Sequence, residues 1–183
     1  MRRYVHGMAA ALLVTALAVP AGAQKTTQIH PGKGGSPHVR SEWSIDGANI
    51  GIEYGRPSLK GRKVGGEVAP YGRPWRTGAD EATTLTTDKP LQFGSLTVPA
   101  GTHTLYTLPG EKDWQLIVSK LQKPGQWGVP YPEGQDLGRV PMKVGQASSP
   151  VEQLTISVDD TAAGGTLRIE WGTVSATAPF TVG

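Results

Sequence analysis

The sequence predicts an all-β protein with an antiparallel β-sandwich or jelly-roll-like fold and little or no helix. Apolar and polar residues alternate with a period of two in several short runs, as in half-buried strands. Turn residues separate these runs, and the chain has 25 glycines and 15 prolines. No segment of about ten or more residues has a helical period. We expect roughly nine or ten short strands.

The clearest element is a hairpin centred on Asp46-Gly47. Apolar residues alternate with polar ones on both sides of this pair, from Val39 to Tyr54. A two-residue turn puts Ile45 opposite Ala48 and Val39 opposite Tyr54, so that the apolar residues share one face. The same register predicts two further cross-strand pairs, Trp43 with Ile50 and Arg40 with Glu53.

Shorter runs predict the remaining strands in chain order. A Thr-rich run over 82–87 precedes a tight hairpin over 91–98, in which Gly94 comes first as a type II′ turn requires. Pro141 marks the run 137–144 as edge-like, because proline has no N–H to donate to a neighbouring strand. The other expected strands are 102–108, 114–119, 154–158, 167–171 and 174–182.

Residues 1–23 have the three parts of a secretory signal peptide. Arg2-Arg3 supplies a positive start, residues 8–19 are almost wholly apolar, and Ala21-Gly22-Ala23 is a small-residue cleavage site. The apolar run of about twelve residues is too short to span a bilayer. We expect cleavage after Ala23 and a periplasmic or secreted protein without a membrane anchor.

The remaining chain predicts a polar, flexible leader over 24–35 and one β-sandwich domain over 36–183. Without Arg2 and Arg3 the chain has 16 basic and 15 acidic residues, so the net charge falls from +3 to +1. A nearly neutral protein gives no reason to expect a nucleic-acid partner. The absence of cysteine excludes disulfides, thiol catalysis and thiolate metal sites. The oligomeric state stays open.

Most of the distinctive charge lies between Tyr54 and Thr84, in a segment rich in Gly and Pro. Arginine binds carboxylate or phosphate through two parallel hydrogen bonds, and tryptophan offers a flat face to a sugar. A second, Pro/Gly-rich loop over 120–136 carries aromatic residues, which favour an ordered loop that packs on or covers something. The expected ligand-binding residues are Arg56, Lys60, Arg62, Trp75, Arg76 and Trp127.

Three functions are compatible with this segment. The first is binding of a small polar or anionic ligand, or a glycan, through loops 56–81. The second is a hydrolase in which Asp80 or Glu81 is the general base and Arg76 stabilises negative charge. The third is a structural envelope protein, in which the arginines pair with nearby carboxylates and clamp the loops to the fold. No serine-hydrolase, zinc-protease, P-loop or dinucleotide-binding motif decides between them.

Three histidines remain to be interpreted. His103 lies in an expected strand and is a weak candidate for a general base, although a lone strand histidine is more often a packing residue. His30 and His38 together suggest a metal-binding tail, but we interpret them as solvated polar residues. The sequence therefore predicts no metal site and no cofactor.

Several stretches resemble a bacterial family of exported proteins, domain of unknown function 2911. The resemblance implies export and an all-β domain, and it supplies no reaction. At position 103 the family usually has tyrosine, whereas this chain has His103. The similar stretches are Y-G-R-P-S-L-K-G-R (54–62), P-Y-G-R-P-W-R-T-G-A-D-E-A-T (70–83), V-P-A-G-T-H-T-L-Y-T-L-P (98–109), W-Q-L-I-V-S-K (114–120) and Q-W-G (126–128).

Overall fold

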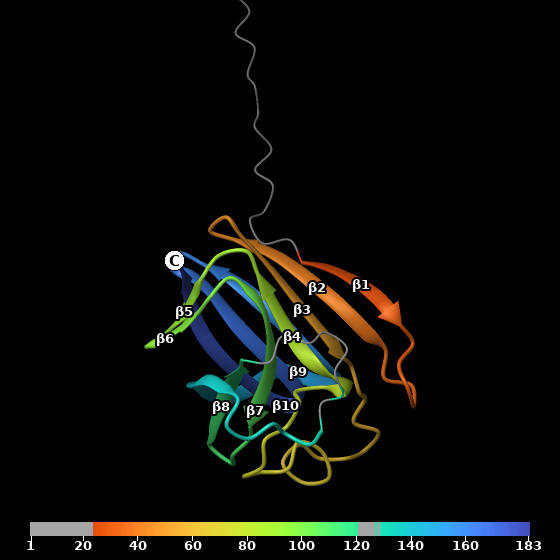
Figure 1. The fold of residues 1–183 in the computed structure, drawn as a ribbon. Helices are drawn as coiled ribbons and strands as arrows, with labels where there is room; N and C mark the ends of the chain where they lie inside the picture. The colour runs from red at the N-terminus through yellow and green to blue at the C-terminus, as the bar shows by residue number, and fades with distance from the viewer. Residues whose placement is uncertain (1–23, 121–126, 128) are drawn as a thin grey trace, which may run out of the picture.

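The computed structural model describes residues 24–120, 127 and 129–183, and its strands form one antiparallel sheet (Figure 1). None of the described residues is helical, so the all-β prediction is confirmed. The division into two sheets that a sandwich or jelly roll implies is not confirmed, because all ten strands join one sheet in the order β1-β2-β3-β4-β7-β8-β9-β10-β5-β6. The strands are β1 (Lys25–His30), β2 (His38–Ile45), β3 (Ala48–Gly55), β4 (Ala79–Thr87), β5 (Leu91–Phe93), β6 (Leu96–Val98), β7 (Gly101–Leu108), β8 (Asp113–Ser119), β9 (Asp136–Thr161) and β10 (Gly164–Val182).

β2 and β3 form the hairpin that the sequence predicts. Asp46 and Gly47 have φ angles of 47° and 74°, and a type I′ turn requires positive φ at both positions. The hairpin of β5 and β6 is also confirmed, with a φ of 56° at Gly94. All four predicted cross-strand pairs of β2 and β3 are present: Ile45 with Ala48, Trp43 with Ile50, Val39 with Tyr54, and Arg40 with Glu53.

Residues 25–30 form β1, where the sequence predicted a flexible leader over 24–35. β1 pairs with β2, with Lys25 opposite Glu42 and Gln28 opposite Val39. Its side chains are exposed, apart from a half-buried His30 at the end. The strand therefore lacks the apolar alternation from which strands are predicted, and its order comes from backbone hydrogen bonds to β2.

β9 and β10 form a long hairpin of 26 and 19 residues, where the sequence predicted several short strands. Register shifts on both sides of Gly172 let β9 carry more residues than β10. Pro141 lies within β9, opposite Gln115 of β8. The edge-like interpretation holds for residues 137–142, which pair with β8 on one side and have no ladder to β10 on the other. The ladder to β10 ends at Lys143, so Pro141 lies just beyond it and its missing N–H breaks no bond there.

The sheet folds back on itself and encloses one apolar core. β2 contacts both β9 and β10, although these strands are far apart in the order of the sheet. Trp43 and Ile52 from the first hairpin share this core with Ile156, Trp171 and Phe180 from the last. Burial of such side chains is the dominant favourable term in folding.

A second, smaller apolar cluster lies on the opposite face of the central strands. It consists of Ala82 on β4, Tyr106 on β7 and Ile117 on β8. The ring of Tyr131 meets that of Tyr106 edge-on, with centroids 5.0 Å apart. Tyr131 belongs to the loop over 120–136, so the described part of that loop does pack against the sheet.

Residues 1–23, where the signal peptide is expected, lie outside the described part of the chain. Cleavage after Ala23 therefore stays a prediction. Within the described part, no helix is long and apolar enough to cross a membrane.

β3 and β4 pack closely at Gly55, the last residue of β3. A Cβ at this position would lie 2.3 Å from the carbonyl oxygen of Ala79, a backbone atom with little room to move. We expect Gly55→Ala to lower the free energy of unfolding by about 1–3 kcal/mol, the usual cost of overpacking. Gly145→Ala is the control, because its Cβ would meet only the carbonyl oxygen of Ser175, at 4.0 Å. Urea unfolding measures both, and equal losses would contradict the prediction.

Candidate functional site

The loop between β3 and β4, residues 56–78, is fastened along β9. The Arg56 side chain donates from Nε to the carbonyl oxygen of Leu154 at 2.9 Å and from Nη2 to Oγ1 of Thr155 at 3.0 Å. Leu154 N–H donates to the carbonyl of Pro57, also at 2.9 Å. Arg56 is therefore a clamp, as the structural alternative expected, but its partners are β9 carbonyl and hydroxyl oxygens and not the carboxylates that were predicted.

Several non-glycine residues in and next to this loop have left-handed backbone. Lys60, Ala69, Thr77 and Asp80 have φ angles of 50°, 46°, 57° and 62°. Such angles are most costly for a β-branched residue, and Thr77 is completely buried. Three hydrogen bonds hold it: its hydroxyl reaches the carbonyl of Trp75 and Oγ1 of Thr107, and its carbonyl accepts from Thr83. Surroundings that fix a strained backbone so firmly are typical of functional sites.

The loop forms one side of an open cavity of about 520 Å³, which we call the cationic cleft. The turn between β1 and β2 forms another side through Lys33, Gly34, Gly35 and Ser36. The charged residues that line the cleft are Lys33, Lys60, Arg62 and Arg76, with Glu67 as the single acid among them.

Two of these charged groups are held by backbone hydrogen bonds. Arg62 donates from Nε to the carbonyl of Leu59 at 2.9 Å and from Nη2 to that of Ser58 at 2.8 Å. The Glu67 carboxylate accepts from Lys63 N–H at 3.1 Å, and this bond lowers the pKa of Glu67. Glu67 therefore stays ionised at neutral pH, and the four cations still outnumber it.

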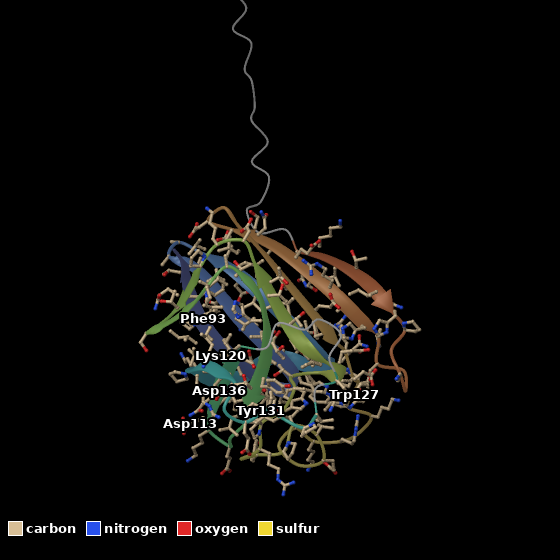
Figure 2. All side chains as sticks on the ribbon, in the orientation of Figure 1. Phe93, Asp113, Lys120, Trp127, Tyr131 and Asp136 are labelled. Carbon is tan, nitrogen blue, oxygen red and sulfur yellow. The ribbon has the colours of Figure 1, made fainter. Side chains whose placement is uncertain are left out.

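Arg76 differs from the other arginines. Its Nε is buried and has no hydrogen-bond partner among the described residues. No carboxylate of the described chain forms an ion pair with it. Its guanidinium carbon lies 5.8 Å from the centre of the Trp127 ring, and Nζ of Lys33 lies 5.4 Å from the same ring. Figure 2 shows Trp127 at the end of the molecule that carries the β3–β4 loop.

The two tryptophans predicted to bind ligand have different environments. Trp75 stacks on Trp171 with ring centroids 5.6 Å apart and planes 10° apart, and it meets Trp114 edge-on at 6.5 Å. Trp75 and Trp171 both line the cleft, so the edge of the apolar core forms its floor. Trp75 thus has one face covered by protein. Trp127 is 44 % exposed.

The two candidate carboxylates lie outside the cleft. Asp80 is buried, and its Oδ2 accepts from Lys33 N–H at 2.8 Å, which fixes the turn between β1 and β2. Glu81 points at the histidines of that turn: its Oε2 lies 3.4 Å from Nδ1 of His38 and 3.9 Å from Nε2 of His30. Neither carboxylate lines the cavity that contains Arg76.

His30 and His38 form a packed pair. Their rings are stacked, with centroids 4.7 Å apart and planes 10° apart. His38 is only 2 % exposed, so its interpretation as a solvated residue was wrong. Burial lowers the pKa of His38, and the nearby charge of Glu81 opposes this effect. The imidazole of His38 is therefore neutral at neutral pH.

His103 lies away from both groups. It is 2 % exposed on β7, opposite Leu85, and its Nε2 lies 2.9 Å from the carbonyl oxygen of Pro99. His103 is therefore a buried packing residue, and it does not line the cleft.

With this geometry in view, the chain can be compared with known proteins. A family model described as "Protein of unknown function (DUF2911)" matches residues 36–180. The chain belongs to this family. Neither a curated protein nor a solved structure matches the chain. The DUF2911 match includes the whole β3–β4 loop and begins after β1, and the description of the family names no activity.

Sequence reasoning missed Lys33, Trp171 and the two packed histidines of this DUF2911 protein. Lys33 and His30 fell within the expected leader, and Trp171 was expected only as the last residue of the strand over 167–171. The alternating run that begins near His38 marked the start of β2, but nothing in it showed that Glu81 would lie nearby. That proximity follows from register, since His38 pairs with Gly55 and Gly55 with Ala79.

The clamp formed by Arg56 predicts a stability effect. Arg56→Met removes two hydrogen bonds from a charged donor, so we expect the free energy of unfolding to fall by about 1.5–3 kcal/mol. Arg73→Met is the control, because Arg73 is exposed and no hydrogen bond or ion pair joins its side chain to another described residue. Its effect should stay within about 0.5 kcal/mol. Chemical denaturation compares the two, and a control that loses as much stability as Arg56→Met would rule out the clamp.

Proposed function

We propose that this protein is an exported binding protein that holds a small anionic ligand in the cationic cleft. The observation that carries the proposal is the unpaired Nε of Arg76. Arg76 lines the cleft, and its Nε is buried without a hydrogen-bond partner among the described residues. Buried polar groups nearly always have a partner, and a charged one is costly to leave unpaired. A carboxylate or phosphate oxygen of a ligand supplies that partner.

The other charges of the cleft favour the same kind of ligand. Lys33 lines the cleft from the turn between β1 and β2 and Lys60 from the β3–β4 loop, while Arg62 is held by the loop carbonyls of Leu59 and Ser58. Four cations against one carboxylate give a positive field in a partly enclosed space, which attracts small anions. The protein as a whole is nearly neutral without residues 1–23, so this field is local.

Binding is better supported than hydrolysis. A general base must lie within hydrogen-bond reach of the group that it deprotonates. The Asp80 carboxylate already accepts a hydrogen bond from Lys33 N–H, and Glu81 faces His30 and His38. A purely structural role suits Arg56 and leaves Arg76 unexplained.

The ligand class can be narrowed by the aromatic residues. A neutral glycan needs free aromatic faces, and one face of Trp75 is covered by Trp171. Two cations already lie over the Trp127 ring. We therefore favour a compound with carboxylate or phosphate groups, acidic sugars included, over a neutral sugar.

Titration of the purified protein with pyrophosphate, citrate and glucuronate tests the proposal, with glucose as the neutral probe. We expect at least one anion to raise the melting temperature and to bind more weakly as salt increases. Arg76→Gln should weaken that binding by about 10-fold or more, the effect of losing one charge-assisted hydrogen bond.

Arg73→Gln is the matched control, because it removes an exposed arginine of the same loop that does not line the cleft. It should leave binding nearly unchanged. The proposal fails if no anion stabilises the protein, or if Arg73→Gln weakens binding as much as Arg76→Gln does.

A further inference from the structure

We propose that His30, His38 and Glu81 form a binding site for a divalent transition-metal ion, with zinc best matched to the donors. The three side chains come from the end of β1, the start of β2 and the start of β4 (Figure 1). One donor atom of each lies within 4.8 Å of the others. Imidazole nitrogen and carboxylate oxygen are both common zinc ligands.

Two buried atoms of the proposed site lack a hydrogen-bond partner in the part of the chain that the structure describes. Nδ1 of His38 and Oε2 of Glu81 are both buried, and neither has a hydrogen-bond partner within the described chain. They face each other at 3.4 Å. A metal ion between them would give both atoms a partner at once. Packing of the two side chains without an ion leaves both atoms unpaired.

Two of the donor–donor distances are close to those of a zinc site. Ligand bonds of about 2.1 Å in a tetrahedral zinc site separate the donor atoms by about 3.4 Å. The distance from Nδ1 of His38 to Oε2 of Glu81 is 3.4 Å, and that from Nε2 of His30 to the same oxygen is 3.9 Å. The His30 ring is stacked on that of His38, so it must turn out of the stack before both rings can point a nitrogen at one ion. The side chain of His30 is 40 % exposed at the end of the edge strand, which gives it room to do so.

A second carboxylate lies beside His38. Oε1 of Glu53 lies 3.7 Å from Nε2 of His38, the ring nitrogen that faces away from Glu81. At 3.7 Å the two atoms form no hydrogen bond, but a shift of less than about 1 Å would let this carboxylate accept the remaining N–H of a coordinating imidazole and orient its ring.

Binding also has an identifiable cost at His30. Its Nδ1 accepts a hydrogen bond from Gly32 N–H at 3.1 Å. Coordination through Nε2 moves the ring proton to Nδ1, so that this bond is lost. This cost falls on His30, the more exposed of the two histidines.

Three protein ligands leave at least one coordination position for water or another ligand. The two histidines also flank residues 31–37, which contribute Gly34, Gly35 and Ser36 to the wall of the cationic cleft. The proposed ion would thus fasten that wall to β4. Its ligands differ from the cations of the cleft, so the two proposals stand or fall separately.

The test uses the full chain without a histidine tag, treated with EDTA and dialysed. Calorimetric titration with Zn²⁺ should show one site per chain, and Co²⁺ should give the visible absorption of a low-symmetry site. His30→Gln and Glu81→Gln should each weaken Zn²⁺ binding by more than about 10-fold, because each removes a direct ligand. His30 is exposed enough for its substitution to leave the fold intact, and circular dichroism checks this.

Two controls make the test specific. Glu42→Gln removes an exposed β2 carboxylate that pairs with Arg40, and it should leave Zn²⁺ affinity unchanged. Arg76→Gln should also leave it unchanged, which separates this site from the cationic cleft. The inference is overturned if the wild type binds Zn²⁺ no more tightly than the His30→Gln variant, or if Glu42→Gln weakens binding as much as Glu81→Gln.

Discussion

The attachment of residues 54–60 to β9 is the constraint on which the rest of the structure depends. The Tyr54 hydroxyl accepts from Ile156 N–H at 2.9 Å, and Leu59 N–H donates to the carbonyl of Glu152 at 2.9 Å. The Arg56 side chain adds its two bonds to β9 between these points. These contacts join segments about one hundred residues apart, so closing the loop between them is costly in chain entropy. They hold the first hairpin against the last one and fix the start of the β3–β4 loop.

The cleft inherits its shape from this attachment. With one end of the loop fixed on β9 and the other returned to the sheet at Thr77, the intervening residues can reach left-handed angles that an unsupported loop would avoid. The Trp75–Trp171 stack continues the apolar core up to the cavity floor. The basic side chains of the loop would repel one another if the loop were compact. This attachment holds them apart around the cationic cleft.

The parts of the fold that sequence could predict are those whose signals are local. The hairpin of β2 and β3 combines an Asp-Gly turn with apolar alternation on both strands, so only one register satisfies both. β1 could not be found in this way because its side chains are exposed and its order depends on the backbone of β2. The sequence did not predict that residues 136–161 form one continuous strand, because Pro141 and the register shifts around Gly172 interrupt its pattern.

The candidate site was predictable to a similar extent. The concentration of charge between Tyr54 and Thr84 located the loop, and four of the six residues expected to bind ligand line the cleft: Lys60, Arg62, Trp75 and Arg76. The partners of Arg56 could not be predicted because they are a β9 carbonyl and a threonine hydroxyl, which no pattern of charges marks. The proximity of His38 and Glu81 depends on the pairing of three strands, and a single sequence does not encode that in a short motif.

The placement of β1 also affects how copies of the chain meet one another. A sheet that folds on itself without closing has two terminal strands, and unpaired backbone there invites edge-to-edge aggregation. Here one terminal strand is β6, only three residues long, and its Leu96 lies against Gly138 of β9. The other is β1, whose exposed side chains are lysine, threonine and glutamine, with the single isoleucine Ile29. The mostly polar side chains that hid β1 in the sequence thus also make this edge a poor template for strand pairing with a second copy.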